Sequence, residues 1–280
     1  MRVEERANAK INLSLDVLSK RPDGYHNVDL IMQEIDFFDE IIIEKNKRRG
    51  FNLIVNGCLI KDYEKDLIYQ AWQELKSLYR GDPSVNIFVD KNIPLAAGLA
   101  GGSSDFASTV RLLNKLWDLG LTRDEMIDLS KKYGADIPFF FMGGSCRATG
   151  IGQDLESLGG FSGKRLILVN NGQGISSAEA YAHIKLSEEK GPMDRVVKYI
   201  EDEDVRLYDI MYNRMENYSL EKIPEIGQIK EELVDLGASV SLMSGSGPTV
   251  FAIFDDEARW NYAYKKLLGK YKYVIKTRTI

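Results

Sequence analysis

The sequence is poor in the residues that build metal sites and disulfide frameworks. Its 280 residues include only two cysteines, Cys58 and Cys146, and two histidines, with no C-x-x-C motif. Zinc sites need clustered Cys and His ligands, and disulfide-rich folds need several cysteine pairs, so both classes are excluded. Free cysteine is usually a buried residue, and we expect both thiols to be buried and inert.

A strong excess of charge of either sign is also missing. The chain has 37 Lys and Arg residues against 42 Asp and Glu residues, a formal net charge of -5. Proteins that bind nucleic acid or anionic membranes through general electrostatics carry a basic surplus. We therefore expect no nucleic-acid partner and no membrane partner, and any anionic ligand must be held by local groups.

Long hydrophobic runs are absent as well. The N-terminal stretch MRVEERANAKINLSL is charged where a signal peptide has its apolar segment, and runs such as IPFFFMGG fall far short of about 20 residues. The sequence thus predicts a cytoplasmic protein. With 44% hydrophobic and 28% charged residues the composition is that of globular domains, and the length indicates about two of them.

Hydrophobic periodicity along the chain predicts a succession of strands and helices. Alternating apolar residues, or runs of β-branched and aromatic residues, predict strands over residues 9–18, 30–45, 51–57, 84–94, 166–171, 249–254 and 270–280. Helical spacing predicts helices near residues 66–79, 106–117 and 121–134, the last opened by a capping box of Thr122 and Glu125. A loop-like composition near residue 160 predicts a domain boundary there, between domains 1–160 and 161–280.

The segment PLAAGLAGGSSD, residues 94–105, leads into a predicted helix that begins near Ser104. Glycines let a backbone approach a ligand closely, and the first N–H groups of a helix have no intrahelical acceptor. Together with the helix dipole these groups form a phosphate site, to which serine hydroxyls at the helix cap can add. The residues concerned are Gly98, Gly101, Gly102, Ser103 and Ser104. The alternative is a glycine-rich turn with a serine cap and no ligand, and the spacing fits neither G-x-x-x-x-G-K-[ST] nor G-x-G-x-x-G.

Two polar residues outside this loop are candidates for phosphoryl transfer. That reaction needs the alcohol oriented and relieved of its proton, and the charge of the phosphoryl group compensated. Asp136 in GADIPFF can accept a proton, although an Asp just after a helix-ending glycine is often only an N-cap. Lys10 in AKINL shares a strand face with Asn8 and Asn12, which is either a ligand-binding row or the solvent side of a half-buried strand.

Three blocks in order resemble the superfamily of galactokinase, homoserine kinase, mevalonate kinase and phosphomevalonate kinase. They are PLAAGLAGGSSD, YGADIPFFFMGGSCRATGIGQDL and MSGSGPTVFAIF. The N-terminal block AKINLSLDVLSKRPDGYHNVDLIMQEID is similar to the superfamily members that phosphorylate 4-diphosphocytidyl-2-C-methyl-D-erythritol. The resemblance covers nearly the whole chain and is weakest over residues 185–232. Ala96 and Ala100 stand where glycines are common in the family, which we interpret as variation that leaves the three loop glycines intact.

The resemblance implies an α+β fold of two domains, the small-molecule kinase fold of the galactokinase, homoserine kinase and mevalonate kinase type, with its active site in the interdomain cleft. The implied reaction is ATP-dependent phosphorylation of the substrate's 2-hydroxyl, which gives the 2-phosphate and ADP in non-mevalonate isoprenoid precursor synthesis. Mg²⁺ is implied by the chemistry of ATP rather than by a ligand cluster. The implied ATP-binding residues are Pro94, Leu95, Ala96, Ala97, Gly98, Leu99, Ala100, Gly101, Gly102, Ser103 and Ser104.

The same resemblance implies a role for each of the two polar candidates. Asp136 is the general base, and Lys10 pairs with it, holding the carboxylate ionised and offsetting charge on the transferred phosphoryl group. The turn Ser244–Pro248 is by its own geometry a hairpin connection, and the resemblance implies that it packs beside the phosphate loop. The segment Arg147–Gln153 is implied to line the cleft, without a chemical role.

The implied substrate-binding residues are Asn12, Tyr25, His26 and Tyr181. An aromatic face can stack on a nucleobase, and an imidazole can hydrogen-bond the edge of the base. The alternatives for Tyr25 and His26 are packing within the loop and a surface imidazole. Two other functions stay open, which are another alcohol kinase of the superfamily, such as homoserine kinase, and a non-catalytic nucleotide-binding module. Competition by cytidine nucleotides separates the cytidylyl kinase from another kinase of the superfamily, because only a cytosine-reading pocket responds. ATP binding without ADP formation from any alcohol would indicate the non-catalytic module.

Overall fold

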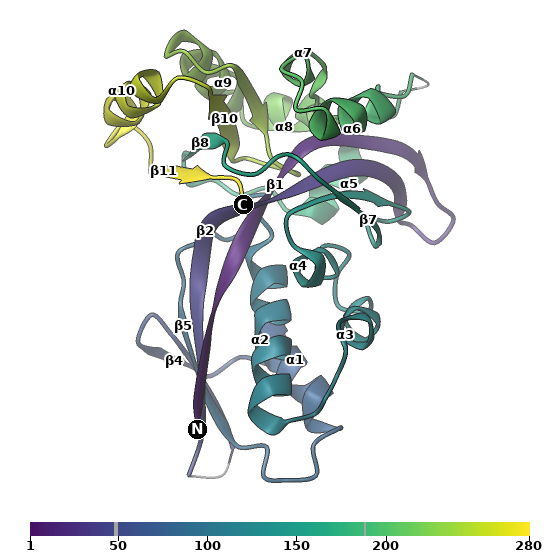
Figure 1. Cartoon of the computed structure of the whole chain (residues 1–280), viewed down its shortest axis with the longest axis vertical. Helices are drawn as coiled ribbons and strands as arrows, with labels where there is room; N and C mark the ends of the chain where they lie inside the picture. Colours follow the sequence, from purple (N-terminus) through teal and green to yellow (C-terminus); the bar gives the residue numbers. More distant parts are fainter. Residues whose placement is uncertain (48–49, 188) are drawn as a thin grey trace. The chain divides into compact units, whose positions relative to one another are not determined.

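The computed structural model describes residues 1–47, 50–187 and 189–280, and the chain is drawn in Figure 1. The strands are β1 (Arg2–Lys20), β2 (His26–Lys45), β3 (Phe51–Val55), β4 (Cys58–Ile60), β5 (Val85–Asp90), β6 (Ser145–Thr149), β7 (Asp154–Leu158), β8 (Arg165–Asn170), β9 (Val240–Met243), β10 (Val250–Phe254) and β11 (Tyr273–Arg278). The helices are α1 (Leu67–Lys76), α2 (Gly101–Trp117), α3 (Arg123–Ser130), α4 (Phe139–Met142), α5 (Ser177–His183), α6 (Met193–Glu201), α7 (Leu207–Ile210), α8 (Glu216–Lys222), α9 (Glu225–Asp235) and α10 (Glu257–Leu267). None of the helices in the described residues has the length and apolar content needed to cross a bilayer.

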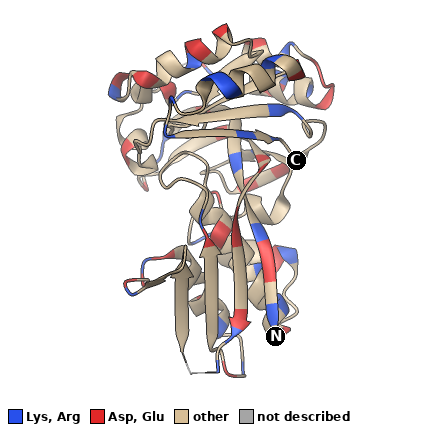
Figure 2. Ribbon diagram, turned by 90° about the vertical axis from the view of Figure 1, so that its left-hand side faces the viewer, with Lys and Arg blue, Asp and Glu red and all other residues tan. Residues whose placement is uncertain are grey.

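The chain divides into two compact units, each made of three separate segments. The first unit contains Met1–Ala9, Phe37–Ile93 and Ala100–Phe141, and the second contains Lys10–Asp36, Pro94–Leu99 and Met142–Ile280. Strands β1 and β2 therefore contribute one part to each unit. The boundary near residue 160 stays a prediction, because interleaved segments do not show which stretch folds on its own. Lys and Arg are interspersed with Asp and Glu in both units (Figure 2).

The first unit combines a sheet with two packed helices. Its strands run in the order β4-β3-β5-β2, with β3 parallel to β5 and the other pairs antiparallel. Alternate residues such as Ile41 and Ile43 are fully buried, as the two-residue period of a strand requires. Helices α1 and α2 pack against each other. The predicted helix is confirmed, but it begins at Gly101 rather than near Ser104, directly after the left-handed backbone of Ala100.

The second unit is built on a four-stranded antiparallel sheet in the order β11-β8-β10-β9. The central strands β8 and β10 carry continuous apolar runs and are almost entirely buried, because helices α9 and α10 pack on this sheet. The first part of β2 pairs with β6, which pairs with β7. The predicted strands over 166–171, 249–254 and 270–280 are confirmed as β8, β10 and β11, and the fold is α+β.

The prediction that both cysteines are buried is wrong for one of them. Cys58 is exposed, because it opens β4, an edge strand that pairs with β3 alone. Cys146 lies in the interior of the second unit, and burial raises the pKa of its thiol to about 11. The predicted capping box is confirmed, since the Thr122 side chain accepts from the Glu125 N–H and Glu125 accepts from the Thr122 N–H.

Candidate active site

The backbone of the phosphate loop, residues 94–104, turns through the left-handed region at three places. Ala96 has φ 50°, Gly98 has φ 78° and Ala100 has φ 55°. The alanines thus keep the conformation for which glycine is favoured, at a cost of about 1 kcal/mol each. The expectation that Ser103 or Ser104 caps the helix is wrong, because Ala100 is the N-cap and both serines lie inside the first turn. Ser104 is fully buried and its Oγ has no hydrogen-bond partner.

Gly98 is the point where the phosphate loop meets the turn Ser244–Pro248. A Cβ on Gly98 would lie 2.1 Å from the Ser244 carbonyl oxygen, so only glycine fits. The Ser244 hydroxyl donates to the Gly98 carbonyl at 3.0 Å and accepts from the Asn12 N–H at 3.2 Å. The expected packing of this turn beside the phosphate loop is therefore confirmed. Sequence reasoning gave Ser244 no role, and its only signal was the Ser-Gly turn before an apolar strand.

Gly98→Ala is expected to lower the free energy of unfolding by about 2–3 kcal/mol, because a methyl group meets fixed backbone and the left-handed conformation is retained. Chemical denaturation measures the loss. Gly120→Ala is the matched control, since Gly120 has φ 71° with nothing within 4 Å of its Cβ position. It should lose only about 1 kcal/mol. Equal losses in the two variants would contradict the close approach of loop and turn.

Lys10 and Asn12 project from β1 toward the same point. Lys10 is 3% exposed and Asn12 is 1% exposed, so the polar row on this strand is not its solvent side. The Lys10 ammonium donates to Asn12 Oδ1 at 2.5 Å and to the Gly98 carbonyl at 3.3 Å. A Cβ on Gly245 would lie 3.4 Å from Lys10 Nζ, so the turn also closes over the lysine. The second unit thus holds a buried cation against the phosphate loop.

Asp136 belongs to the first unit, in the turn between α3 and α4. It is half-buried and follows Gly134, whose Cβ position lies 4.0 Å from Ser103 Oγ. The neighbouring Ile137 is fully buried, and its N–H donates to the Gly134 carbonyl at 3.3 Å, which fixes the turn. The structure therefore brings the Asp136 turn beside the first turn of α2. Because Lys10 lies in the second unit, its pairing with Asp136 stays a prediction.

The aromatic residues that were expected to bind the cytosine base lie together in the second unit. Tyr25 is 60% exposed in the turn between β1 and β2, whereas His26 is buried. The surface-imidazole alternative is therefore wrong. The His26 ring stacks on Tyr181 of α5 with centroids 5.2 Å apart and planes 22° apart. Burial, with Lys20 nearby, lowers the pKa of His26, so its imidazole is neutral at pH 7.

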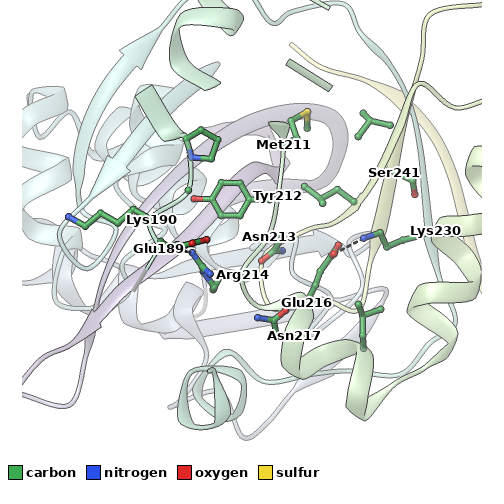
Figure 3. A pocket seen from close by; sticks show the side chains of 15 residues that line it. Glu189, Lys190, Met211, Tyr212, Asn213, Arg214, Glu216, Asn217, Lys230 and Ser241 are labelled. Carbon is green, nitrogen blue, oxygen red and sulfur yellow. Dashed lines mark hydrogen bonds and ion pairs between the residues drawn. The ribbon is translucent and has the colours of Figure 1, made fainter. Parts of the chain in front are cut away.

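A cavity of about 590 Å³ lies in the second unit, and none of the residues that line it was predicted as a site residue (Figure 3). Asn213 lines the cavity and donates to the carbonyls of Met243 and Gly245 at 2.7 and 2.8 Å. These hydrogen bonds help to fix the turn Ser244–Pro248. Arg214 in its wall pairs with the buried Asp16 at 2.8 Å. Burial opposes ionisation of Asp16, but hydrogen bonds from Arg214 and the Gly191 N–H outweigh it and lower the pKa.

The chain matches two family models, described as GHMP kinases N terminal domain over residues 66–144 and GHMP kinases C terminal over residues 200–271. It is 43% identical to the 4-diphosphocytidyl-2-C-methyl-D-erythritol kinase of Finegoldia magna, covering 97% of this chain and 98% of that one. The kinase of the same name from a Geobacillus species is 42% identical, with coverage of 96% and 94%. A crystal structure of 4-(cytidine 5'-diphospho)-2C-methyl-D-erythritol kinase aligns with TM-score 0.84 and 24% identity, covering 99% of each chain. The mevalonate kinase of Methanococcus jannaschii aligns with TM-score 0.71 and 17% identity, covering 100% and 98%.

Proposed function

The chain belongs to the 4-diphosphocytidyl-2-C-methyl-D-erythritol kinases of the GHMP kinase family, and from this premise we propose how its residues perform the reaction. The enzyme is an ATP-dependent kinase that phosphorylates the 2-hydroxyl of 4-diphosphocytidyl-2-C-methyl-D-erythritol and releases ADP. Neither homoserine kinase nor a non-catalytic module is favoured by its relatives. The observation that best supports the proposed site is a set of contacts at Gly98 of the phosphate loop. Lys10 and Ser244 donate to the Gly98 carbonyl, and the Asn12 N–H donates to the Ser244 hydroxyl.

The phosphate loop, residues 94–104, binds the phosphates of ATP. Its left-handed residues turn the backbone ahead of α2, whose first N–H groups and positive dipole end attract anions. The unpartnered Ser104 hydroxyl supplies a further donor to a phosphate oxygen. A buried ammonium at Gly98 compensates charge close to the same loop.

Asp136 and Lys10 carry the chemical step. The Asp136 carboxylate takes the proton of the 2-hydroxyl while that oxygen bonds to the γ-phosphorus of ATP. The bond from the γ-phosphorus to the β,γ-bridging oxygen breaks, and ADP leaves with that electron pair. Lys10 offsets the negative charge that develops on the reacting oxygens, and burial makes its field stronger than in water.

Mg²⁺ accompanies ATP and supplies charge compensation at the phosphates when bound. Among the residues that the structure describes, no group of three or more His, Cys, Asp or Glu side chains gathers as a metal site. Magnesium commonly needs only one or two protein carboxylates beside phosphate oxygens and water. Asp136 is already assigned as the proton acceptor, so we assign no protein ligand to the ion.

The cytidylyl substrate is bound by Tyr25, His26, Tyr181 and Asn12. The exposed Tyr25 ring offers a free face for the cytosine, and the neutral His26 can hydrogen-bond the base edge. The His26–Tyr181 stack leaves no space for a base between its rings, so the base stacks on an outer face. Asn12, beside Lys10, orients the alcohol through its amide.

Tyr25→Ala is expected to raise the KM for the cytidylyl substrate by about 10- to 100-fold, because one base stack is worth about 1–3 kcal/mol. The KM for ATP should stay within about twofold. Steady-state kinetics with each substrate varied in turn measures both constants. Tyr262→Ala is the control, since Tyr262 is a similarly exposed tyrosine of α10 and should change neither constant.

Cytidine monophosphate tests the base site without any substitution. It should inhibit competitively against the alcohol substrate and not against ATP, whereas adenosine monophosphate should not compete with the alcohol. Cytidine monophosphate that leaves the rate unchanged at millimolar concentration would remove the base-binding role from Tyr25 and His26.

A further inference from the structure

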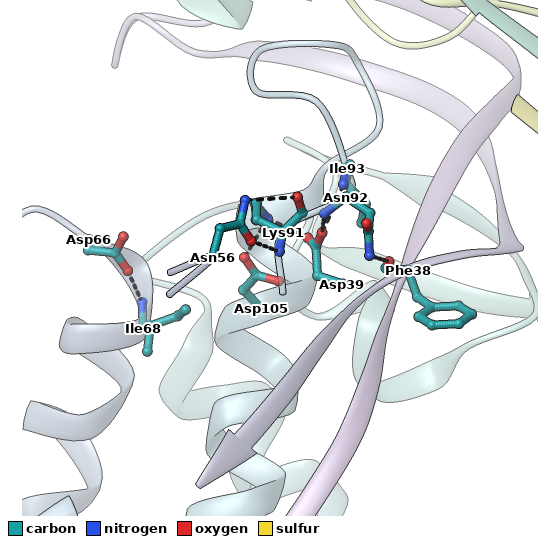
Figure 4. Close-up of polar contacts among 9 residues, drawn as sticks. All are labelled: Phe38, Asp39, Asn56, Asp66, Ile68, Lys91, Asn92, Ile93 and Asp105. Atoms are coloured by element: carbon teal, nitrogen blue, oxygen red, sulfur yellow. Dashed lines mark hydrogen bonds and ion pairs between the residues drawn. The ribbon is translucent and has the colours of Figure 1, made fainter. Parts of the chain in front are cut away.

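A buried charged cluster lies in the first unit, formed by Lys91, Asp39 and Asp105 (Figure 4). The Lys91 ammonium donates to Asp105 Oδ2 at 2.5 Å and also bonds to Asp39 Oδ2. The side chains of Asp39, Asp105 and Lys91 are 0%, 5% and 16% exposed. Such burial requires that the charges be paired, so this cluster is a fixed element of the unit.

The cluster holds the start of the phosphate loop. Asp39 Oδ1 accepts from the N–H groups of Asn92 and Ile93 at 2.6 and 2.8 Å. Ile93 is the residue directly before Pro94, where the loop begins. The Lys91 N–H in turn donates to Asn56 Oδ1 at 2.7 Å. The chain entering the loop is therefore fixed at three successive residues.

The same cluster holds the end of the loop. Asp105 lies just past the first turn of α2, directly after Ser104. A Cβ on Gly101 would lie 2.8 Å from Ile93 Cγ2 and 3.2 Å from Lys91 Nζ, so the two ends of the loop pack against each other. Lys91 thus joins the chain that enters the loop to the helix that leaves it.

The two carboxylates of the cluster differ in the hydrogen bonds that they accept. Asp39 accepts hydrogen bonds on both oxygens, whereas Asp105 Oδ1 is buried without a partner. Burial raises the pKa of Asp105 to about 7, although the Lys91 ammonium opposes this rise. A neutral side chain at position 105 that still accepts from Lys91 therefore preserves the cluster, while a neutral side chain at position 39 does not.

We propose that Asp39 and Lys91 are positioning residues for the phosphates of ATP, because they fix both ends of the phosphate loop from one buried cluster. Neither residue touches the nucleotide. They hold the left-handed Ala100 and the first N–H groups of α2 in the arrangement that receives the phosphates. This inference rests on the proposed role of the loop in ATP binding.

The test compares the Kd for Mg·ATP of the wild-type enzyme, Lys91→Met, Asp39→Asn and Asp105→Asn by titration calorimetry. Lys91→Met and Asp39→Asn should each weaken binding by about 10-fold or more, and Asp105→Asn by less than about threefold. The KM for the cytidylyl substrate should stay within about twofold in all three. The matched control is Arg111→Met. Arg111 lies farther along α2 and forms an ion pair with Glu5 of β1, so its replacement should lower stability and leave the Kd for Mg·ATP unchanged.

Thermal unfolding is measured beside each titration, so that weakened binding is scored only on folded protein. Should Lys91→Met fail to fold, the contrast between Asp39→Asn and Asp105→Asn still decides. Folded Lys91→Met and Asp39→Asn enzymes that bind Mg·ATP as tightly as Arg111→Met would overturn the inference and leave the proposed function standing. A wild-type enzyme that does not bind Mg·ATP would overturn both.

Discussion

Asp136→Asn is expected to lower kcat by about 10² to 10⁴ while leaving the Kd for Mg·ATP nearly unchanged. The amide keeps the size and polarity of the side chain but cannot take the proton of the 2-hydroxyl, and general-base contributions fall in this range. Asp136 is half-buried in a turn fixed by Ile137, so the exchange should not disturb the fold. Single-turnover rates and calorimetry separate the chemical step from binding.

Asp128→Asn is the matched control for that substitution. Asp128 lies in α3, and its side chain is 73% exposed and pairs only at the surface with Lys131. Surface pairs of this kind contribute little, so kcat should stay within about twofold. An Asp136→Asn enzyme as active as Asp128→Asn would take the general-base role away from Asp136.

Lys10→Met is expected to lower kcat by about 10² to 10³, because it removes the buried charge that we propose offsets charge on the transferred phosphoryl group. Methionine has nearly the length of the lysine stem and fits an apolar surrounding. It removes the lysine donor from Asn12 Oδ1, and it leaves the Gly98 carbonyl with the Ser244 hydroxyl as its donor. Some loss of stability should accompany the loss of rate. Rates are therefore compared below the unfolding transition of the variant, with folded protein confirmed by circular dichroism.

Lys115→Met provides the comparison for the lysine. Lys115 is an exposed residue near the end of α2, far along the helix from the phosphate loop. Its replacement should leave kcat and both KM values within about twofold. If Lys10→Met retained wild-type kcat and differed only in stability, the lysine would be a structural residue and the proposed charge compensation would be wrong.

Local patterns in the sequence predicted the elements that local physics controls. The apolar runs of β8 and β10 and the capping box at Thr122 depend on residues that are close in the sequence, and the structure contains all three. The glycine loop was recognisable because its spacing leads into an amphipathic helix. Its resemblance to a family added the expectation that the turn at Ser244 packs beside it, which the contact with Gly98 confirms.

Features that depend on distant packing could not be predicted from such patterns. The alternation around Lys10 is equally compatible with a solvent face. Lys10 is buried through contacts with Gly98 and with the turn at Ser244 and Gly245, which lie far away in the sequence. Alanine disfavours the left-handed region, so nothing local announces the backbone of Ala96 and Ala100. Asp39 and Lys91 are isolated charged residues in the sequence, and strand pairing alone brings them together.

The central claim is tested most directly by ADP release from the purified chain with Mg·ATP and 4-diphosphocytidyl-2-C-methyl-D-erythritol, run beside homoserine and mevalonate. Phosphorus NMR of the products locates the new phosphoryl group. The account predicts stoichiometric ADP and a 2-phosphate with the cytidylyl substrate alone. Phosphorylation of homoserine or mevalonate instead, or ATP binding without ADP from any of the three alcohols, would contradict it.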